Sequence, residues 1–159
     1  MNRNILSFTL RMRQGLALLA TLASLTILLS GCGAETNVKK GDQFYAIGEY
    51  FDASAEYKKA YSRTAIKDKA KRGERAWKLA ECYRHINYNA KAAGAYQNAL
   101  RYHYPDSLAL LYLAQAQQRQ GDYKNALKNY EAYLELVPGD QLAVHFLWEG
   151  RILVIGSET

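Results

Sequence analysis

The chain has 159 residues and two cysteines, with 21 basic and 15 acidic side chains that give a net charge of +6. Three arginines and no acid lie in residues 1–31, so the remaining 18 basic and 15 acidic side chains give only +3. That excess argues against a nucleic-acid-binding protein, which needs a concentrated basic face. A chain of this length forms one domain, and thirteen tyrosines with only two prolines indicate an all-α fold.

Residues 1–31 have the features of a secretory signal peptide. Arg3, Arg11 and Arg13 precede an apolar stretch of about fourteen residues (16–29), and small residues follow it. The stretch is shorter than the roughly 20 apolar residues that a membrane-spanning helix needs. We therefore expect residues 1–31 to be removed during export.

The residues at the end of this stretch, Leu29-Ser30-Gly31-Cys32, resemble the lipobox of bacterial lipoproteins. The resemblance implies cleavage before Cys32 and acylation of its thiol, with chains such as palmitate that hold a protein on a bilayer almost permanently. Gly33 follows the cysteine, where an aspartate retains enterobacterial lipoproteins in the inner membrane. The resemblance therefore implies an outer-membrane anchor, most simply facing the periplasm. The alternative is an ordinary buried cysteine at the end of a signal anchor.

Three later segments repeat one pattern. They are GEYFDASAEYKKAY (48–61), NYNAKAAGAYQNAL (87–100) and GDYKNALKNYEAYL (121–134). In each segment an alanine precedes a tyrosine by four residues, and a further small residue lies twelve residues before that alanine. The small residues, alanines and tyrosines are Gly41, Ala53 and Tyr57, then Ala80, Ala92 and Tyr96, then Ala114, Ala126 and Tyr130.

This pattern resembles the tetratricopeptide repeat, a helix–turn–helix unit of 34 residues. The resemblance implies a solenoid of three repeats across residues 41–140, with repeats at about 34–67, 73–106 and 107–140 and the lipidated anchor in 32–40. Five surplus residues, 68–72, lengthen a helix or its turn. Lys40, Gln117 and Tyr133 depart from the residue types that the repeat prefers.

Residues 141–159 begin like the first helix of a fourth repeat, but Trp148 occupies the small-residue position. Repeat arrays need an atypical terminal helix to cover the last apolar face. We interpret this segment as a capping helix or as a truncated fourth repeat, and the apolar end 152–155 favours truncation slightly.

The lipobox and the segments 40–61 and 80–102 together resemble the N-terminal region of certain outer-membrane lipoproteins of Bacteroidota. Those proteins usually continue into an OmpA-like peptidoglycan-binding domain, and some are accessory components of the type IX secretion apparatus. The resemblance covers about residues 29–140.

The sequence contains few residue patterns that are typical of a catalytic or metal-binding site. Cys82 and His85 lie three residues apart beside Glu81, but a metal site usually needs three or four ligands and no second pair is present. We find no glycine-rich phosphate loop and no Ser-His-Asp set. We therefore expect no catalytic residue, no metal and no cofactor, and a metal- or thiol-dependent enzyme built on Cys82 and His85 is the minor alternative.

A binding groove is the better prediction. In tetratricopeptide arrays the first helices of successive repeats line a concave groove for a peptide or a partner helix. The repeat phase places ten residues there: Asp42, Tyr45, Trp77, Glu81, Arg84, His85, Leu111, Gln115, Gln118 and Arg119. Trp77 is expected to face the open groove without a role in folding, the alternative being that it packs beneath residues 68–72.

The chaperone-binding branch of the family holds a C-terminal carboxylate with a clamp of Lys, Asn and Arg. The corresponding positions here are Val38, Asp42, Lys78, Leu108 and Tyr112, so the clamp is absent. The sequence thus predicts a lipid-anchored module that scaffolds an envelope complex, with a secretion complex as a candidate. Its partners are envelope proteins or peptides and not nucleic acid. A peptidoglycan-linked envelope stabiliser is the alternative.

Overall fold

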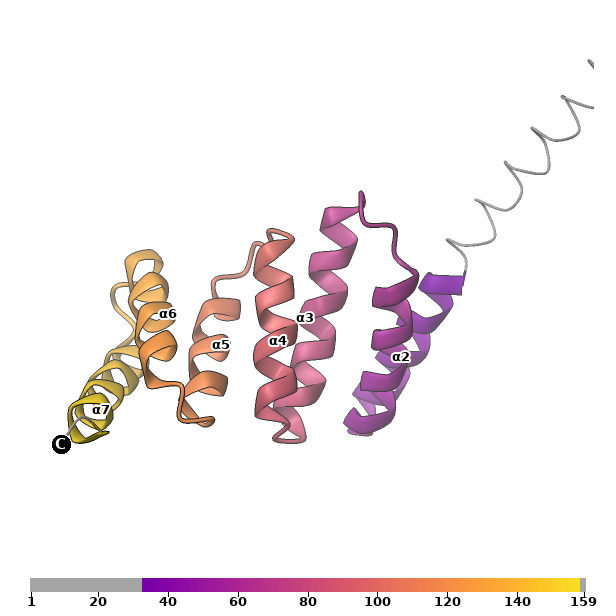
Figure 1. Cartoon of the computed structure of the whole chain (residues 1–159). Coiled ribbons are helices and arrows are strands. Elements are labelled where there is room, and N and C mark those ends of the chain that lie inside the picture. The colour runs from indigo at the N-terminus through magenta and orange to yellow at the C-terminus, as the bar shows by residue number, and fades with distance from the viewer. Residues whose placement is uncertain (1–32, 158–159) are drawn as a thin grey trace, which may run out of the picture.

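The computed structural model describes residues 33–157, so the predicted signal peptide and Cys32 lie outside the described part. The described residues form seven helices and no strand, which confirms the all-α class. Figure 1 shows them side by side in one row. They are residues 33–46, α2 (Tyr50–Arg63), α3 (Lys69–His85), α4 (Asn89–Arg101), α5 (Leu108–Gln118), α6 (Tyr123–Leu136) and α7 (Gln141–Ser157). None of these helices is long and apolar enough to cross a membrane.

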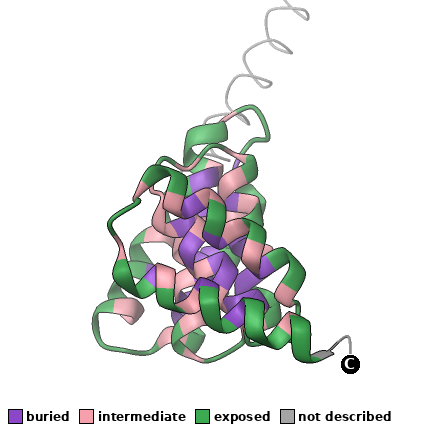
Figure 2. Ribbon diagram, turned by 90° about the vertical axis from the view of Figure 1, so that its left-hand side faces the viewer, coloured by how far each residue is buried: buried purple, intermediate pink, exposed green. Residues whose placement is uncertain are grey.

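Each helix packs mainly against the helix before it and the helix after it, as in a solenoid. Smaller contacts join alternate helices, such as those between α5 and α7 and between Lys78 of α3 and Asp42 of the first helix. Buried residues line the facing sides of the helices, and exposed residues cover the outer sides (Figure 2). Because contacts are so local, each helical pair stabilises only its neighbours.

The turn inside each helical pair has the same backbone design. Gly48, Asn87 and Gly121 occupy the left-handed region, with φ values of 81°, 59° and 80°. The next residue then donates its backbone N–H to a carbonyl five residues earlier, over distances of 2.9 to 3.0 Å. This arrangement satisfies carbonyl groups that the end of a helix leaves unpaired. Glycine adopts it without cost, and asparagine is among the residues that tolerate it best.

The repeated small residues and tyrosines form the contacts between helices. Ala53, Ala92 and Ala126 are at most 1% exposed, and the three tyrosines that follow them are at most 2% exposed. At Gly41 a Cβ atom would lie 2.6 Å from the Tyr57 ring. The tyrosine therefore packs where the opposite helix has no side chain, or only a methyl group.

The surplus residues 68–72 extend α3 at its N-terminus. Asp68 caps the helix and accepts a hydrogen bond from the backbone N–H of Lys71 at 3.2 Å. Helix α3 has 17 residues where its counterpart α5 has 11. Figure 1 shows the end of α3 beyond the neighbouring ends of α2 and α4.

Two departures from the repeat pattern have local explanations. Gln117 is buried, and its side-chain oxygen accepts a hydrogen bond from Asn129 Nδ2 at 2.7 Å. Tyr133 is buried as well, and its hydroxyl donates to Asp140 Oδ2 at 2.8 Å. Asp140 also caps α7, because its Oδ1 accepts from the backbone N–H groups of Leu142 and Ala143.

Helix α7 packs against α6 through Ala143, Leu147 and Gly150, which are all buried. Trp148, which stands where earlier repeats have Gly41, Ala80 and Ala114, is 57% exposed. A small residue is needed at this position only where a second helix packs on the first. No described helix covers that side of α7, so a large side chain fits there.

We predict that Ala92→Leu and Ala126→Leu each lower the free energy of unfolding by about 1–3 kcal/mol, because both alanines are enclosed and extra methyl groups overpack them. Ala90→Leu is the matched control, since Ala90 lies exposed on the same helix as Ala92. Urea unfolding midpoints measure the effect. Equal midpoints for Ala90→Leu and Ala92→Leu would contradict the packing described above.

Candidate functional site

A hollow that carries polar groups lies between the helix of residues 33–46, α2, α3 and the segment after α4. It has a volume of about 420 Å³. Its lining combines aromatic rings with charged side chains: Asp42, Tyr45, Tyr57, Glu74, Trp77, Lys78, Glu81 and Tyr104. Four of the ten residues predicted from the repeat phase, Asp42, Tyr45, Trp77 and Glu81, meet here. We call it the first-repeat hollow.

Buried tyrosines hold polar groups on the groove side of the first helices. Tyr57 donates its hydroxyl proton to Asp42 Oδ1 at 2.7 Å, and Tyr96 donates to Glu81 Oε1. Burial and the accepting carboxylate both raise the pKa of each tyrosine far above its ordinary value. In the third repeat Tyr130 donates to Gln118 Oε1 at 2.6 Å. Each core tyrosine thus fixes one predicted groove residue.

The first-repeat hollow has an excess of negative charge. Three carboxylates, Asp42, Glu74 and Glu81, line it together with a single lysine, Lys78. The lysine Nζ lies 2.7 Å from Asp42 and 3.8 Å from Glu74. Burial opposes ionisation of Asp42, but hydrogen bonds from Lys78 and Tyr57 outweigh it and lower the pKa of that carboxyl. The hollow is therefore anionic at neutral pH.

Trp77 lines this hollow and also belongs to the packing of the domain. Its ring stacks on Tyr104 with the centroids 4.9 Å apart and meets the ring of Tyr96 edge-on at 5.5 Å. It also stacks on Tyr112 of α5 at 6.0 Å. The expectation that Trp77 has no role in folding is wrong, and its partners come from α4, the segment after α4 and α5, and not from residues 68–72.

Arg84 is likewise engaged within the fold. Its guanidinium donates to both carboxylate oxygens of Glu81, at 3.1 and 2.7 Å, and lies 4.5 Å from the centre of the Tyr112 ring. The ion pair with Glu81 raises the pKa of Arg84 although burial opposes this. Removing Arg84 would thus leave Glu81 in the hollow with one cation fewer.

His85 lies at the far end of α3 among aromatic rings. It stacks on Tyr50 with the centroids 4.2 Å apart, and its Nε2 lies 3.2 Å from the hydroxyl of Tyr45. Burial and the nearby Arg84 lower the pKa of His85, so the ring is neutral at pH 7. His85 is exposed, and Tyr45 and Tyr50 position its ring.

Cys82 is fully buried, unlike its neighbour His85. Burial, with a smaller contribution from Glu81, raises the pKa of the Cys82 thiol to about 12. A nucleophilic cysteine needs a lowered pKa and access to solvent. Within residues 33–157 no group of three His, Cys, Asp or Glu side chains could hold a metal ion. Neither observation supports the enzyme alternative.

A second hollow, of about 270 Å³, lies between α5, α6 and α7. It includes three of the predicted groove residues, and its lining is Gln115, Gln118, Arg119, Tyr123, Tyr130, Phe146 and Leu153. Leu111, also predicted for the groove, is only 4% exposed in the core between these helices. It offers no surface to a partner.

The ten residues predicted for the groove do not include Glu74, Lys78 and Tyr104, which line the first-repeat hollow. Glu74 and Lys78 lie three residues before and one residue after Trp77, so helical periodicity could have placed all three on one face. Tyr104 follows the end of α4 and has no helical period to reveal it. The contribution of residues 102–107, which connect α4 to α5, is visible only in the three-dimensional structure.

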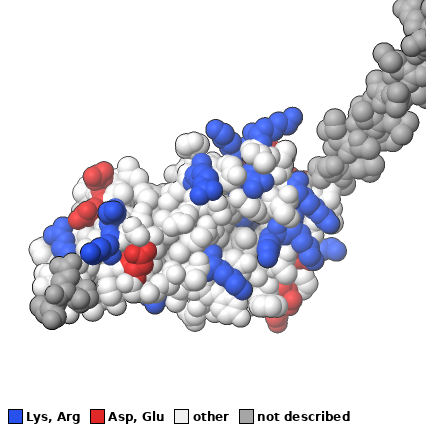
Figure 3. Space-filling model, viewed as in Figure 1, with Lys and Arg blue, Asp and Glu red and all other residues white. Residues whose placement is uncertain are grey.

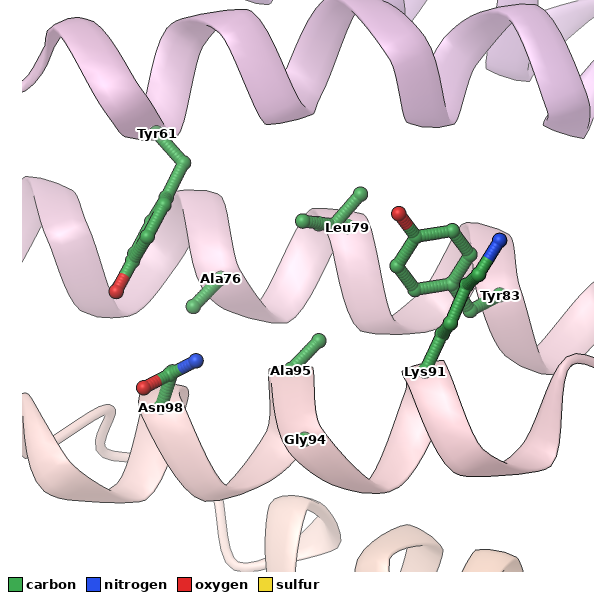
Figure 4. Close-up of a pocket in the computed structure, with 8 residues that line it drawn as sticks. All are labelled: Tyr61, Ala76, Leu79, Tyr83, Lys91, Gly94, Ala95 and Asn98. Atoms are coloured by element: carbon green, nitrogen blue, oxygen red, sulfur yellow. The ribbon is translucent and has the colours of Figure 1, made fainter.

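A third hollow lies on the opposite face of α3, against the second helices. It measures about 210 Å³, and Figure 4 shows Tyr61 of α2, Tyr83 of α3 and Lys91 of α4 at its rim. Small residues, Ala76, Gly94 and Ala95, lie between them. This hollow holds one charged side chain, a lysine, and so it differs in charge from the first-repeat hollow.

Comparison with known proteins identifies the fold. Residues 107–149 match the tetratricopeptide repeat family model. No curated protein sequence matches the chain significantly.

The described architecture is that of solved tetratricopeptide domains. The C-terminal domain of a Plasmodium falciparum protein named as FK506-binding has a TM-score of 0.68 at 18% identity and covers 81% of this chain and 93% of its own. The Arabidopsis OM64 domain has a TM-score of 0.64 at 17% identity. The match covers 77% of this chain and 97% of that domain. The second domain of human RPAP3, solved with the HSP70 peptide SGPTIEEVD, has a TM-score of 0.62 at 20% identity. The match covers 77% of this chain and 96% of that domain. The chain is thus a tetratricopeptide solenoid in fold.

We predict that Trp77→Ala lowers the free energy of unfolding by about 3 kcal/mol, the lower end of the range for a large aromatic residue, because Trp77 is only partly buried. Trp148→Ala removes the same side chain from an exposed position and should change stability by less than about 0.5 kcal/mol. Thermal or urea unfolding of the two variants gives the comparison. Equal losses would mean that the stacking around Trp77 contributes nothing.

Proposed function

We propose that this tetratricopeptide solenoid is a lipid-anchored protein–protein interaction module of a bacterial cell envelope. Its groove holds an extended segment or a helix of a partner, and its assembly is an envelope complex, with a secretion complex as the candidate that the Bacteroidota resemblance suggests. The observation that carries the proposal is the first-repeat hollow, in which buried tyrosines hold the carboxylates of Asp42 and Glu81 beside aromatic rings.

The chemistry of the hollow favours a basic or aromatic side chain of the partner. Aromatic faces attract cations, and carboxylates pair with Lys or Arg. Trp, Tyr and Arg also dominate binding energy at interfaces. An acidic C-terminus such as that of the HSP70 peptide bound to RPAP3 is a poor fit, because Asp42 and Glu74 would repel it and Lys78 is already paired with Asp42.

The anchoring part of the proposal is supported by sequence alone. The short apolar stretch, the lipobox residues 29–32 and the glycine after Cys32 favour acylation and delivery to the outer membrane, facing the periplasm. A protein held there by lipid presents its groove to other envelope proteins without a spanning helix.

We predict that Glu74→Lys weakens binding of basic peptides about tenfold, because it replaces an exposed carboxylate of the hollow with a cation. The probes are peptides selected from a random display library on the purified protein, measured by fluorescence polarisation. Selection should enrich Lys, Arg or aromatic residues, and a peptide ending in EEVD should not bind.

The control is Glu135→Lys, which makes the same change of charge at an exposed position of α6. It should retain binding, and both variants should keep the melting temperature of the parent. Equal binding by the two variants, or selection of acidic peptides, would contradict the proposed use of the hollow.

We predict that Cys32→Ala yields an uncleaved or mislocalised precursor that incorporates no fatty acid, because acylation requires the thiol. Cys82→Ala is the control, since that thiol is buried within the fold and should leave processing unchanged. Radiolabelled fatty acid, mass spectrometry and membrane fractionation supply the measurements. Equal labelling of the Cys32→Ala protein would remove the lipid anchor from the proposal.

A further inference from the structure

Basic side chains concentrate on the edge of the solenoid where α2 ends and α3 begins. Residues 63–72 hold five basic side chains and one acid. We define the basic edge as Arg63, Lys67, Lys69, Lys71 and Arg101, all of which are exposed. Figure 3 shows Lys and Arg side chains gathered over this end of the molecule. Lys69 and Lys71 belong to the additional turn of α3, and Figure 1 shows this end of α3 beyond the neighbouring helix ends.

The basic edge adjoins the start of the described chain. Arg63 Nη1 donates to the backbone carbonyl of Gly33 at 3.5 Å and to Asn37 Oδ1 at 2.6 Å. Lys71 Nζ lies 3.5 Å from Glu35, and the buried Arg75 donates to the same carboxylate at 2.6 Å. Gly33 is the residue after Cys32, so a lipid on Cys32 would bring this edge to the bilayer surface.

Part of the basic edge is held in place by the fold. Arg72 joins it to α2 and α4: its guanidinium lies 4.2 Å from the centre of the Tyr61 ring and 5.0 Å from that of Tyr102. Its Nη1 also donates to the backbone carbonyl of Thr64 at 2.8 Å. The segment between α2 and α3 is therefore fixed against the end of α4, where Arg101 lies.

The lysines at the tip are available to a ligand. Among the described residues, neither Lys67 nor Lys69 forms an ion pair or a side-chain hydrogen bond, whereas Lys71 is shared between Glu35 and Asp68. Beside Lys67 stands Ile66, which is 75% exposed. An aliphatic tip surrounded by lysines matches the chemistry of a membrane interface, where acyl chains lie beneath phosphate groups.

The opposite edge of the solenoid has different chemistry. Its turns also expose an isoleucine, Ile47, but the charges near these turns are mixed: Glu49, Asp52 and Asp122 are balanced by Lys91, Arg119 and Lys124. Anionic headgroups therefore attract the basic edge, whereas the opposite edge has no net charge to attract them. The charge distribution thus selects one orientation of the molecule on a membrane.

We propose that the basic edge, with Ile66 at its tip, contacts the anionic phospholipid headgroups of the membrane that holds Cys32. This inference rests on the lipid anchor of the proposed function. The contact holds the first repeat against the bilayer and sets the direction in which the groove faces, whereas the acyl chains alone would leave the solenoid free to rotate.

The experiment uses the processed, lipidated protein in vesicles of phosphatidylcholine, with or without phosphatidylglycerol. Amine-reactive labelling read by mass spectrometry reports each lysine separately, so Lys124 and Lys128 of α6 serve as controls within the same molecule. At low salt, labelling of Lys67 and Lys69 should fall roughly fivefold in the anionic vesicles, the factor expected from one basic side chain near an anionic surface. High salt should restore the labelling.

A charge-reversal pair tests the cause. Lys71, the third lysine of the basic edge, should also be protected from labelling in the anionic vesicles. Lys67→Glu with Lys69→Glu should abolish this protection of Lys71, whereas Lys124→Glu with Lys128→Glu should preserve it. Ile66→Ser should weaken the protection, and Ile47→Ser should not. Equal labelling of Lys67 and Lys69 in both kinds of vesicle would overturn the inference.

The outcomes separate this inference from its premise. A protein shown by mass to be acylated, with equally labelled lysines, overturns the membrane contact alone. A protein without acyl groups overturns the lipid anchor and the contact together. If inorganic phosphate protected Lys67 and Lys69 from labelling in vesicles of phosphatidylcholine alone, the basic edge would be a site for free anions. That result would also overturn the membrane contact.

Discussion

The contact between a second-helix tyrosine and a small residue of the preceding helix determines most of this structure. The ring occupies the space that Gly41, Ala80 or Ala114 leaves free, and all three tyrosines are almost completely buried. A buried hydroxyl needs a hydrogen-bond partner. Each tyrosine finds that partner on the groove side, so the same side chain that closes the core also orients a polar group on the surface.

This coupling gives the polar side chains on the groove side a defined geometry. Asp42 and Glu81 stand on the first helices, but their positions are set by tyrosines from the second helices. The groove is therefore an extension of the core packing and not a separate layer of side chains. The basic edge is organised differently, by Arg72 between two aromatic rings and by ion pairs with Glu35.

The fold was predictable because its signal is repeated. An alanine and a tyrosine at constant spacing occur three times, and glycine marks two of the three inner turns. Asn87 escaped notice because only the backbone reveals its positive φ. The candidate site was less predictable: helical phase found Asp42 and Glu81, but it could not see that Leu111 is enclosed or that Tyr104 returns to stack on Trp77. The first depends on the packing of α6 and α7 around Leu111, and the second on the path of the chain after α4, and the spacing of alanines and tyrosines encodes neither.

The core consists of two clusters, and Tyr112 of α5 packs against both. Such a division allows partial opening, because the C-terminal helices can separate from α5 while the first cluster stays intact. Amide hydrogens of α6 and α7 would then exchange with solvent through smaller fluctuations than those of α3. The hollow around Gln118 would open and close with them, while the one around Glu81 persists. The solenoid would combine a rigid recognition end with an adaptable one.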